Sequence, residues 1–203
     1  MAGIGDDIKE VFQELGSPVA VNKYKNSDPV VEFIDSEFFE SSDPYTRQTV
    51  MEVSLAFDSV IQSGDVITLT DNNTHLLVVS LNLQRFDQNV VTKEAMTYRC
   101  NVLGTISEFQ RSRDDNYKLT EDWVPISDEV PCLVTGDISQ YSVNMEEYGN
   151  FVGQELSLHI TGDISVEKGN HFTTSDGIVF NITAIAPHRL NNVNICKIEE
   201  VKG

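Results

Sequence analysis

Basic residues are scarce in this sequence, and their scarcity argues against one class of function. Only 14 lysines and arginines stand against 32 aspartates and glutamates in 203 residues, which gives a formal net charge of −18. Contacts of lysine or arginine with phosphate supply most nucleic-acid affinity, so a chain this acidic repels DNA and RNA. We therefore expect no sequence-specific binding of nucleic acid. The acidic surface either keeps the protein soluble or forms a wall past which nucleic acid slides.

Cysteines are also few. Cys100, Cys132 and Cys196 are far apart in the chain, and no CxxC or mixed His/Cys ligand spacing occurs. An odd number of isolated cysteines argues against a disulfide framework and against a zinc site. We interpret the three residues as small buried hydrophobes that stay reduced.

Long apolar runs are missing as well. No run approaches the roughly 20 residues that a bilayer-spanning helix needs. The first sixteen residues lack the basic start and the continuous apolar stretch of a signal peptide. We expect a protein that is made and used inside a cell and that does not contact a membrane.

Recognisable catalytic motifs are absent too. The four histidines form no HxH or HExxH pattern, and no GxSxG, Walker A or GxGxxG sequence occurs. Residues 71–73, Asp-Asn-Asn, have the residue types of a calcium loop without its continuation, so they indicate a turn. We expect no enzymatic activity, no metal and no cofactor.

One amphipathic helix is predicted near the start of the chain. Asp6 and Asp7 would lie in its first turn, where negative charge suits the helix dipole. Gly16 and Pro18 would end it. A helix this short must pack on something to persist. The apolar positions at helical spacing are Ile4, Ile8, Val11, Phe12 and Leu15.

The remainder of the chain has the pattern of β-structure. Residues 50–57 alternate between apolar and polar side chains, which is typical of a half-buried strand. In Ser63–Arg111 two apolar strands flank a polar turn, and a third strand follows with Gly104 as a kink or bulge. We predict a mainly β protein. Its core would be an antiparallel β-barrel or sandwich, with one short N-terminal helix and a second small β module.

A segment near the C-terminus, Lys168–Val201, resembles Ser63–Arg111. Two interpretations stay open: a duplicated module, or two hairpins that obey the same turn chemistry. The alignment pairs Gly64 with Gly169, Asp71 with Asp176, and Arg85 with Arg189.

Composition divides the chain into three parts. Residues 1–110 would hold the helix and the main β domain, and residues 131–203 the C-terminal β module. Between them, residues 111–130 are polar and charged, which predicts a linker or a long loop. Trp123, the only tryptophan, would either anchor this loop to the core or anchor an interface.

Several short motifs resemble the neck proteins of tailed bacteriophages, the head-closure or head–tail connector family. The N-terminal helix before a first strand is similar to that family as well. Asn170 stands where the family pattern has aspartate. The motifs are Gly64-Asp65 at the start of a strand, Ser80–Gln84 at the end of the next, Tyr98-Arg99-Cys100-Asn101 in a third, and the turn Lys168-Gly169-Asn170.

This resemblance implies a non-enzymatic structural protein of the virion neck that is synthesised in the host cytoplasm. Its copies would form a homo-oligomeric ring, closed by heterologous contacts, that lines the DNA exit channel. Its other partners would be the portal or adaptor protein on the head side and a tail or tail-terminator protein. DNA would pass through the channel without sequence-specific binding, and no cofactor is implied. The layer of the neck stays open: stopper, collar or tail completion.

Two polar segments, 87–94 and 111–130, interrupt the predicted strands and are expected to be interface or channel loops. The alternative is that they are ordinary exposed loops. Strand edges offered to neighbouring subunits are a second expected mode of contact. The candidate residues are Asp87, Asn89, Lys93, Glu94, Arg111, Arg113, Asp114, Asp115 and Trp123.

Three other functions remain as alternatives. The chain could be another phage structural part, either a tail terminator or a baseplate subunit. It could also be a small cytosolic ligand-binding β-barrel or an enzyme. The last two predict a deep pocket with converging polar groups.

Overall fold

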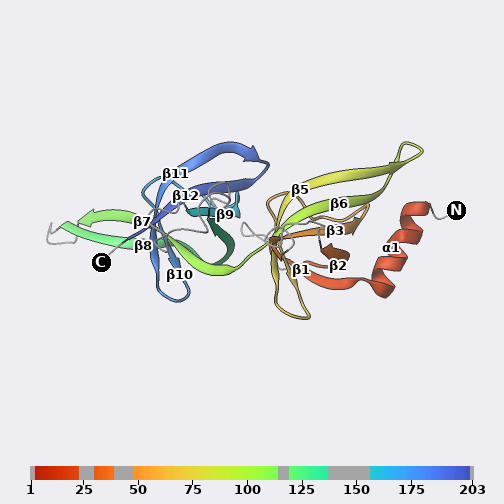
Figure 1. Cartoon of the computed structure of the whole chain (residues 1–203), viewed down its shortest axis with the longest axis horizontal. Helices are drawn as coiled ribbons and strands as arrows, with labels where there is room; N and C mark the ends of the chain where they lie inside the picture. Colours follow the sequence, from red (N-terminus) through yellow and green to blue (C-terminus); the bar gives the residue numbers. More distant parts are fainter. Residues whose placement is uncertain (1–2, 23–29, 39–47, 114–118, 137–155, 202–203) are drawn as a thin grey trace, which may run out of the picture. The chain divides into compact units, whose positions relative to one another are not determined.

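The structure is a computed structural model that describes residues 3–22, 30–38, 48–113, 119–136 and 156–201 (Figure 1). It is mainly β, with two six-stranded antiparallel barrels and one short helix, so the predicted fold class is confirmed. The chain divides into two compact units. The first contains residues 1–100 together with 161–163 and 190–193, and the second contains the rest.

The first barrel is closed, with the strand order β1-β2-β3-β6-β5-β4. Pairing of β1 with β4 closes it, with Val21 opposite Ile67. The helix α1 precedes these strands in the chain. The elements are α1 (Ile4–Leu15), β1 (Ser17–Asn22), β2 (Val30–Phe38), β3 (Val50–Ala56), β4 (Val66–Leu69), β5 (His75–Phe86) and β6 (Asn89–Arg99).

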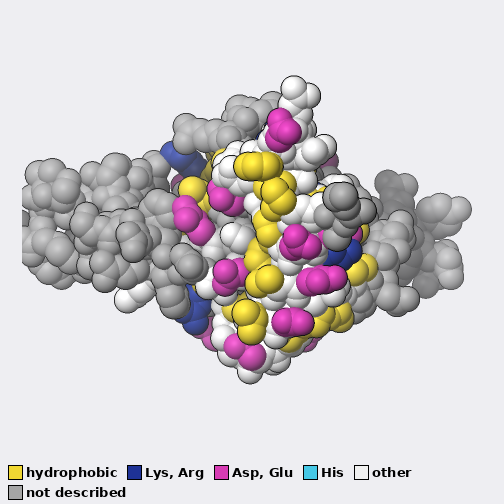
Figure 2. All heavy atoms as spheres, turned by 90° about the vertical axis from the view of Figure 1, so that its right-hand side faces the viewer, with side chains coloured by type: hydrophobic (Ala, Val, Ile, Leu, Met, Phe, Trp, Pro, Cys, Tyr) yellow, Lys and Arg dark blue, Asp and Glu magenta, His cyan; other side chains and the backbone are white. Residues whose placement is uncertain are grey.

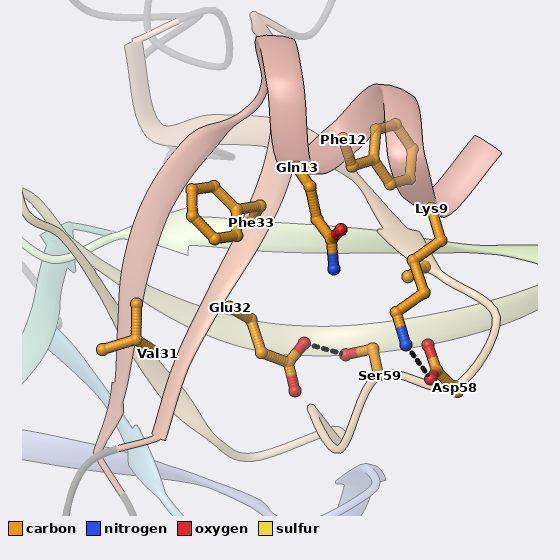
Figure 3. Close-up of a pocket in the computed structure, with 9 residues that line it drawn as sticks. Lys9, Phe12, Gln13, Val31, Glu32, Phe33, Asp58 and Ser59 are labelled. Carbon is orange, nitrogen blue, oxygen red and sulfur yellow. Dashed lines mark hydrogen bonds and ion pairs between the residues drawn. The ribbon is translucent and has the colours of Figure 1, made fainter. Parts of the chain in front are cut away.

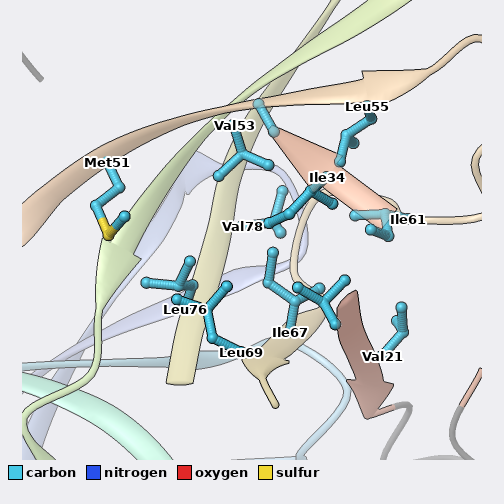
Figure 4. Close-up of a cluster of buried hydrophobic side chains, with 12 residues drawn as sticks. Val21, Ile34, Met51, Val53, Leu55, Ile61, Ile67, Leu69, Leu76 and Val78 are labelled. Carbon is cyan, nitrogen blue, oxygen red and sulfur yellow. The ribbon is translucent and has the colours of Figure 1, made fainter. Parts of the chain in front are cut away.

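Alternation along the strands builds the core of this barrel. In β3, Met51, Val53 and Leu55 are buried and Glu52 is exposed, as the sequence predicted. Figure 4 shows these three side chains pointing into one cluster with Ile34 and Val78 from neighbouring strands. Burial of this apolar surface is the main favourable contribution to the stability of the barrel.

The predicted helix is confirmed as α1, and its two ends are defined by hydrogen bonds. At the start, the Gly3 N–H donates to Asp6 Oδ2 at 2.9 Å. At the end, the Gly16 N–H donates to the carbonyl of Phe12 at 2.9 Å. Phe12 is the buried residue of the helix.

The second barrel is also closed, with the order β10-β11-β12-β9-β8-β7. Phe172 and Ile106 are fully buried in it, and so are two of the cysteines, Cys132 and Cys196, as predicted. Cys100 is half-buried, and none of the three cysteines forms a disulfide. The strands are β7 (Val102–Arg113), β8 (Leu119–Gly136), β9 (Leu156–Thr161), β10 (His171–Thr174), β11 (Val179–Leu190) and β12 (Val193–Glu200).

The two barrels share one strand order. Read from β7, the order of the second barrel is β7-β8-β9-β12-β11-β10. With the strands of each barrel numbered from one to six, both barrels therefore have the order 1-2-3-6-5-4, and strand 4 pairs with strand 1. Turn chemistry by itself acts on one hairpin at a time and does not explain six strands in the same order. The structure therefore favours a duplicated module.

Equivalent turns lead into β4 and β10. Gly64 has φ +92° and Gly169 has φ +94°, a region that L side chains rarely adopt. The residue after each glycine is buried and accepts a hydrogen bond from the backbone three residues before it. Asp65 accepts from the N–H of Gln62 at 2.8 Å, and Asn170 accepts from the N–H of Glu167 at 2.6 Å.

The expected boundaries at 110 and 131 differ from those of the structure. The division falls between Cys100 and Asn101, and residues 111–113 and 119–130 belong to β7 and β8 instead of a linker. Most residues of β8 up to Glu129 are exposed. Two strands exposed on both faces carry no apolar alternation, so their sequence resembles that of a loop.

Candidate protein interface

The outer parts of β7 and β8 form a two-stranded ribbon that continues beyond the second barrel (Figure 1). β10 pairs with β7 only from Gly104 to Ser107, and β9 pairs with β8 only from Leu133 to Gly136. Residues 108–113 and 119–124 therefore have each other as strand partners. Such a ribbon has exposed backbone groups along its outer edges.

Aromatic and charged side chains line one face of this ribbon. The strand register places Phe109 opposite Trp123 and Arg111 opposite Glu121, so these four side chains share a face. His171 on β10 lies opposite Ser107 and extends the row at the barrel end. We name these five residues, His171, Trp123, Phe109, Arg111 and Glu121, the aromatic ladder.

Each member of the aromatic ladder contacts the next. The rings of His171 and Trp123 are stacked, with centroids 3.4 Å apart and planes 14° apart. The Trp123 and Phe109 rings are tilted, with centroids 5.3 Å apart. The Arg111 guanidinium lies 5.5 Å from the Phe109 centroid and forms an ion pair of 2.9 Å with Glu121. The contacts hold these side chains in one arrangement.

The aromatic ladder is ordered and yet accessible. Trp123 is 41 % exposed and Phe109 43 % exposed. Desolvation lowers the pKa of His171, so its ring is neutral at neutral pH and stacks without a charge. Tryptophan and arginine on a rigid surface are the residue types that most often dominate a protein–protein contact. This face therefore combines residue types that are common in protein–protein contacts.

The second candidate segment, 87–94, is a tight turn followed by a strand. Asp87 and Gln88 have φ of +46° and +70°, the conformation of a two-residue hairpin turn. Residues 89–94 belong to β6, so the expectation of a loop there is wrong. The alternation of this strand is weak because residues 90–93 in its outer part are half-buried on both faces.

The predicted residues of this hairpin have different environments. Asp87 and Asn89 are exposed at its tip. Glu94 accepts a hydrogen bond from the Gln84 side chain at 2.7 Å. Lys93 donates to the carbonyl of Ser59 at 2.6 Å, so it is held against its own barrel.

The structure brings together two of the nine predicted residues, Arg111 and Trp123. Arg113 is the last residue of β7, and Asp114 and Asp115 lie outside the described residues. The other three members of the aromatic ladder, Phe109, Glu121 and His171, were missed. One signal in the sequence could have predicted this strand pairing. Phe109 and Arg111 are two residues apart, and so are Glu121 and Trp123, which is the spacing of side chains on one face of a strand.

A depression between α1 and β2 is lined by polar groups that already have partners within the chain. Figure 3 shows Lys9 against Asp58 and Glu32 against Ser59. Lys9 Nζ is 2.5 Å from Asp58 Oδ2, and this hydrogen bond raises the lysine pKa. Glu32 accepts from the Ser59 hydroxyl at 2.5 Å and from the Val60 N–H at 2.8 Å. Because these groups satisfy one another, the depression offers few polar groups to a ligand.

No group of three or more His, Cys, Asp or Glu residues in the described ranges is placed to hold a metal ion. Among those ranges, no helix combines the length and apolar character that crossing a bilayer requires.

Comparison with protein-family models, with characterised proteins and with solved structures finds no significant match for this chain.

Proposed function

We propose that this chain is a non-enzymatic assembly protein whose copies associate through the β7–β8 ribbon. The aromatic ladder carries this proposal. It presents Trp123, Phe109 and Arg111 on a ribbon that extends past the barrel, ordered by their mutual contacts and still accessible. Side chains fixed before binding lose less conformational entropy when a partner covers them.

The closed barrels restrict where strand pairing between subunits can occur. A closed barrel has no free edge, so strand addition is confined to parts of strands that leave the barrel. In β7 those are residues 108–113, which include Phe109 and Arg111 of the aromatic ladder. A contact that joins this edge to a different surface of the next copy is heterologous, and such contacts close into rings when the rotation per subunit permits.

The resemblance of the sequence to phage neck proteins gives the ring its proposed location. The ring would join the DNA-filled head to the tail and line the exit channel, in contact with portal or adaptor protein and with tail protein. The net charge of −18 fits this role, because an acidic wall repels the phosphate backbone and lets DNA slide. The virion neck is thus the proposed site of action.

Light scattering after size-exclusion chromatography tests the self-association. We expect the wild type to form a closed oligomer, and Phe109→Ala with Trp123→Ala to shift it to monomer without loss of folding. Ile178→Ala is the matched control, because Ile178 is another exposed apolar residue of the same barrel, 41 % exposed. An oligomer that survives the double substitution would contradict the role of the aromatic ladder.

Electron microscopy of the native particle tests the location separately. We expect a symmetric ring between portal and tail. Density within the tail or at its far end would indicate another phage structural part instead, either a tail terminator or a baseplate subunit. A monomer with a buried ligand would indicate a binding protein or an enzyme and would overturn the assembly role.

A further inference from the structure

A second surface, on α1, is apolar and uncovered. Ile4, Ile8, Val11 and Leu15 follow the i, i+4, i+7, i+11 spacing, which places them in one row along the helix. We name this row the α1 stripe. Ile4 is 47 %, Val11 50 % and Leu15 82 % exposed. Figure 2 shows a band of hydrophobic side chains on this end of the first barrel, with aspartate and glutamate side chains on both sides.

The α1 stripe, of which only Ile8 is half-buried, is not the main contact of the helix with its own barrel. That contact is made by Phe12, which is buried, and by Gly5, where an added Cβ would lie 3.0 Å from the Phe57 ring. Lys9 holds the same side of the helix through Asp58. The apolar row is therefore available to a partner, and its alternating spacing of four and three residues is that of a helix–helix seam.

Acidic residues beside the α1 stripe define the charge of that partner. Asp7, Glu10 and Glu14 follow the i, i+3, i+7 spacing, so they form a second row parallel to the apolar one. All three are exposed, and no lysine or arginine in the described part of the chain forms an ion pair with them. A partner with basic residues along its flank would neutralise this row. A second copy of this chain would bring the same acidic row to this surface, and the two rows would repel each other.

We infer that the α1 stripe is the docking site for an amphipathic helix of a different protein. The partner helix has apolar residues at three- and four-residue spacing and a flanking row of lysine or arginine. The α1 stripe and the apolar residues of the partner helix bury each other. The acidic row of α1 and the basic row of the partner select the partner and set the orientation of its helix. This inference does not depend on the proposed ring, because its residues lie outside the aromatic ladder.

Two synthetic three-heptad helical peptides test the inference against the full chain. Both carry leucine at the seam positions; one has lysine and the other glutamate at the flanking positions. Fluorescence anisotropy should show binding of the lysine peptide, weakening as salt rises, and much weaker binding of the glutamate peptide. Leu15→Asp should reduce affinity for the lysine peptide by about tenfold or more. Because Leu15 is 82 % exposed, this variant is expected to fold.

A charge reversal, Glu10→Lys with Glu14→Lys, should exchange the preference between the two peptides. Leu119→Asp is the control, because Leu119 is 53 % exposed and lies on β8; it should bind like the wild type. Equal binding of both peptides, or no binding, overturns the inference. If the wild type self-associates and Leu15→Asp does not, the α1 stripe binds a second copy of this chain. If the wild type binds phosphatidylcholine vesicles and Leu15→Asp does not, the α1 stripe binds lipid. Either result overturns the inference.

Discussion

Gly104 shows how the lack of one side chain shapes the second barrel. A Cβ at this position would lie 2.3 Å from a ring carbon of Phe172 and 2.7 Å from the carbonyl oxygen of Thr173. Phe172 is fully buried, and the pairing register shifts between Gly104 and Ile106. The sequence predicted a kink or bulge at Gly104, and this shift confirms it. The ring that requires the glycine comes from β10, which is distant in the chain, so no local pattern predicts it.

Replacing Gly104 by alanine should destabilise the second barrel by about 1–3 kcal/mol, because the added methyl group overlaps the Phe172 ring. Urea unfolding followed by the fluorescence of Trp123 measures this change. Gly169→Ala is the comparison: it has open space but φ +94°, so it should cost about 1–2 kcal/mol from backbone strain alone.

The pair Gly104→Ala and Phe172→Leu separates these causes. A smaller side chain at position 172 makes room for the new methyl group, so the double variant should lose less stability than the sum of the single losses. Strictly additive losses would show that the clash is not the reason for the glycine.

At the scale of the element, amphipathic spacing predicted α1 correctly but did not tell which face is buried. Four of the five apolar positions lie on the α1 stripe, while Phe12 is buried. The contact side is set by Gly5 and Lys9 as much as by apolar residues. Helical spacing of apolar residues shows that one face of a helix can be buried. Which element or protein covers that face depends on tertiary packing.

Phe12→Ala should loosen α1 from the first barrel and leave the barrel folded, because Phe12 is the buried residue of the helix. Hydrogen exchange of residues 4–15 should speed up, with exchange in β3 and β5 unchanged. The matched control is Leu15→Ala, which removes an exposed side chain and should not alter exchange. Faster exchange throughout the strands would instead mean that the helix is part of the barrel core.

The β7–β8 ribbon shows the opposite error at the same scale. Residues 111–130 are polar and charged, so the sequence predicted a linker or a long loop there, yet cross-strand pairs hold the ribbon as two strands. The pairs that identify it, Phe109 with Trp123 and Arg111 with Glu121, face each other only after the strands have aligned. The strand register therefore identifies a candidate interface on such a ribbon, whereas the local sequence pattern of each strand does not.

At the scale of the whole molecule, three histidines couple stability to acid. Desolvation lowers the pKa of His75 in the first barrel and of His159 and His171 in the second. The unfolded chain, with an ordinary histidine pKa near 6.5, therefore binds protons more readily than the folded chain. The stabilising contribution is fully present above about pH 6.5 and is lost as the pH falls toward the lowered values.

We expect the free energy of unfolding to fall between about pH 7 and pH 5. A variant with His75, His159 and His171 all replaced by glutamine should show a smaller fall, because glutamine does not titrate. Urea unfolding at both pH values measures the difference. An equal fall in both proteins would assign the pH dependence to carboxylates instead.

Composition and alternation determined that this chain is β-rich, carries one short amphipathic helix near its start and has an acidic surface. These properties depend on residues close together in sequence, where a two- or three-to-four-residue period records which side chains share a face. The tertiary structure decided that there are two closed barrels of one strand order and that Trp123 meets His171. It also decided that the α1 stripe stays uncovered. Those features depend on the pairing of distant strands, which no local period encodes.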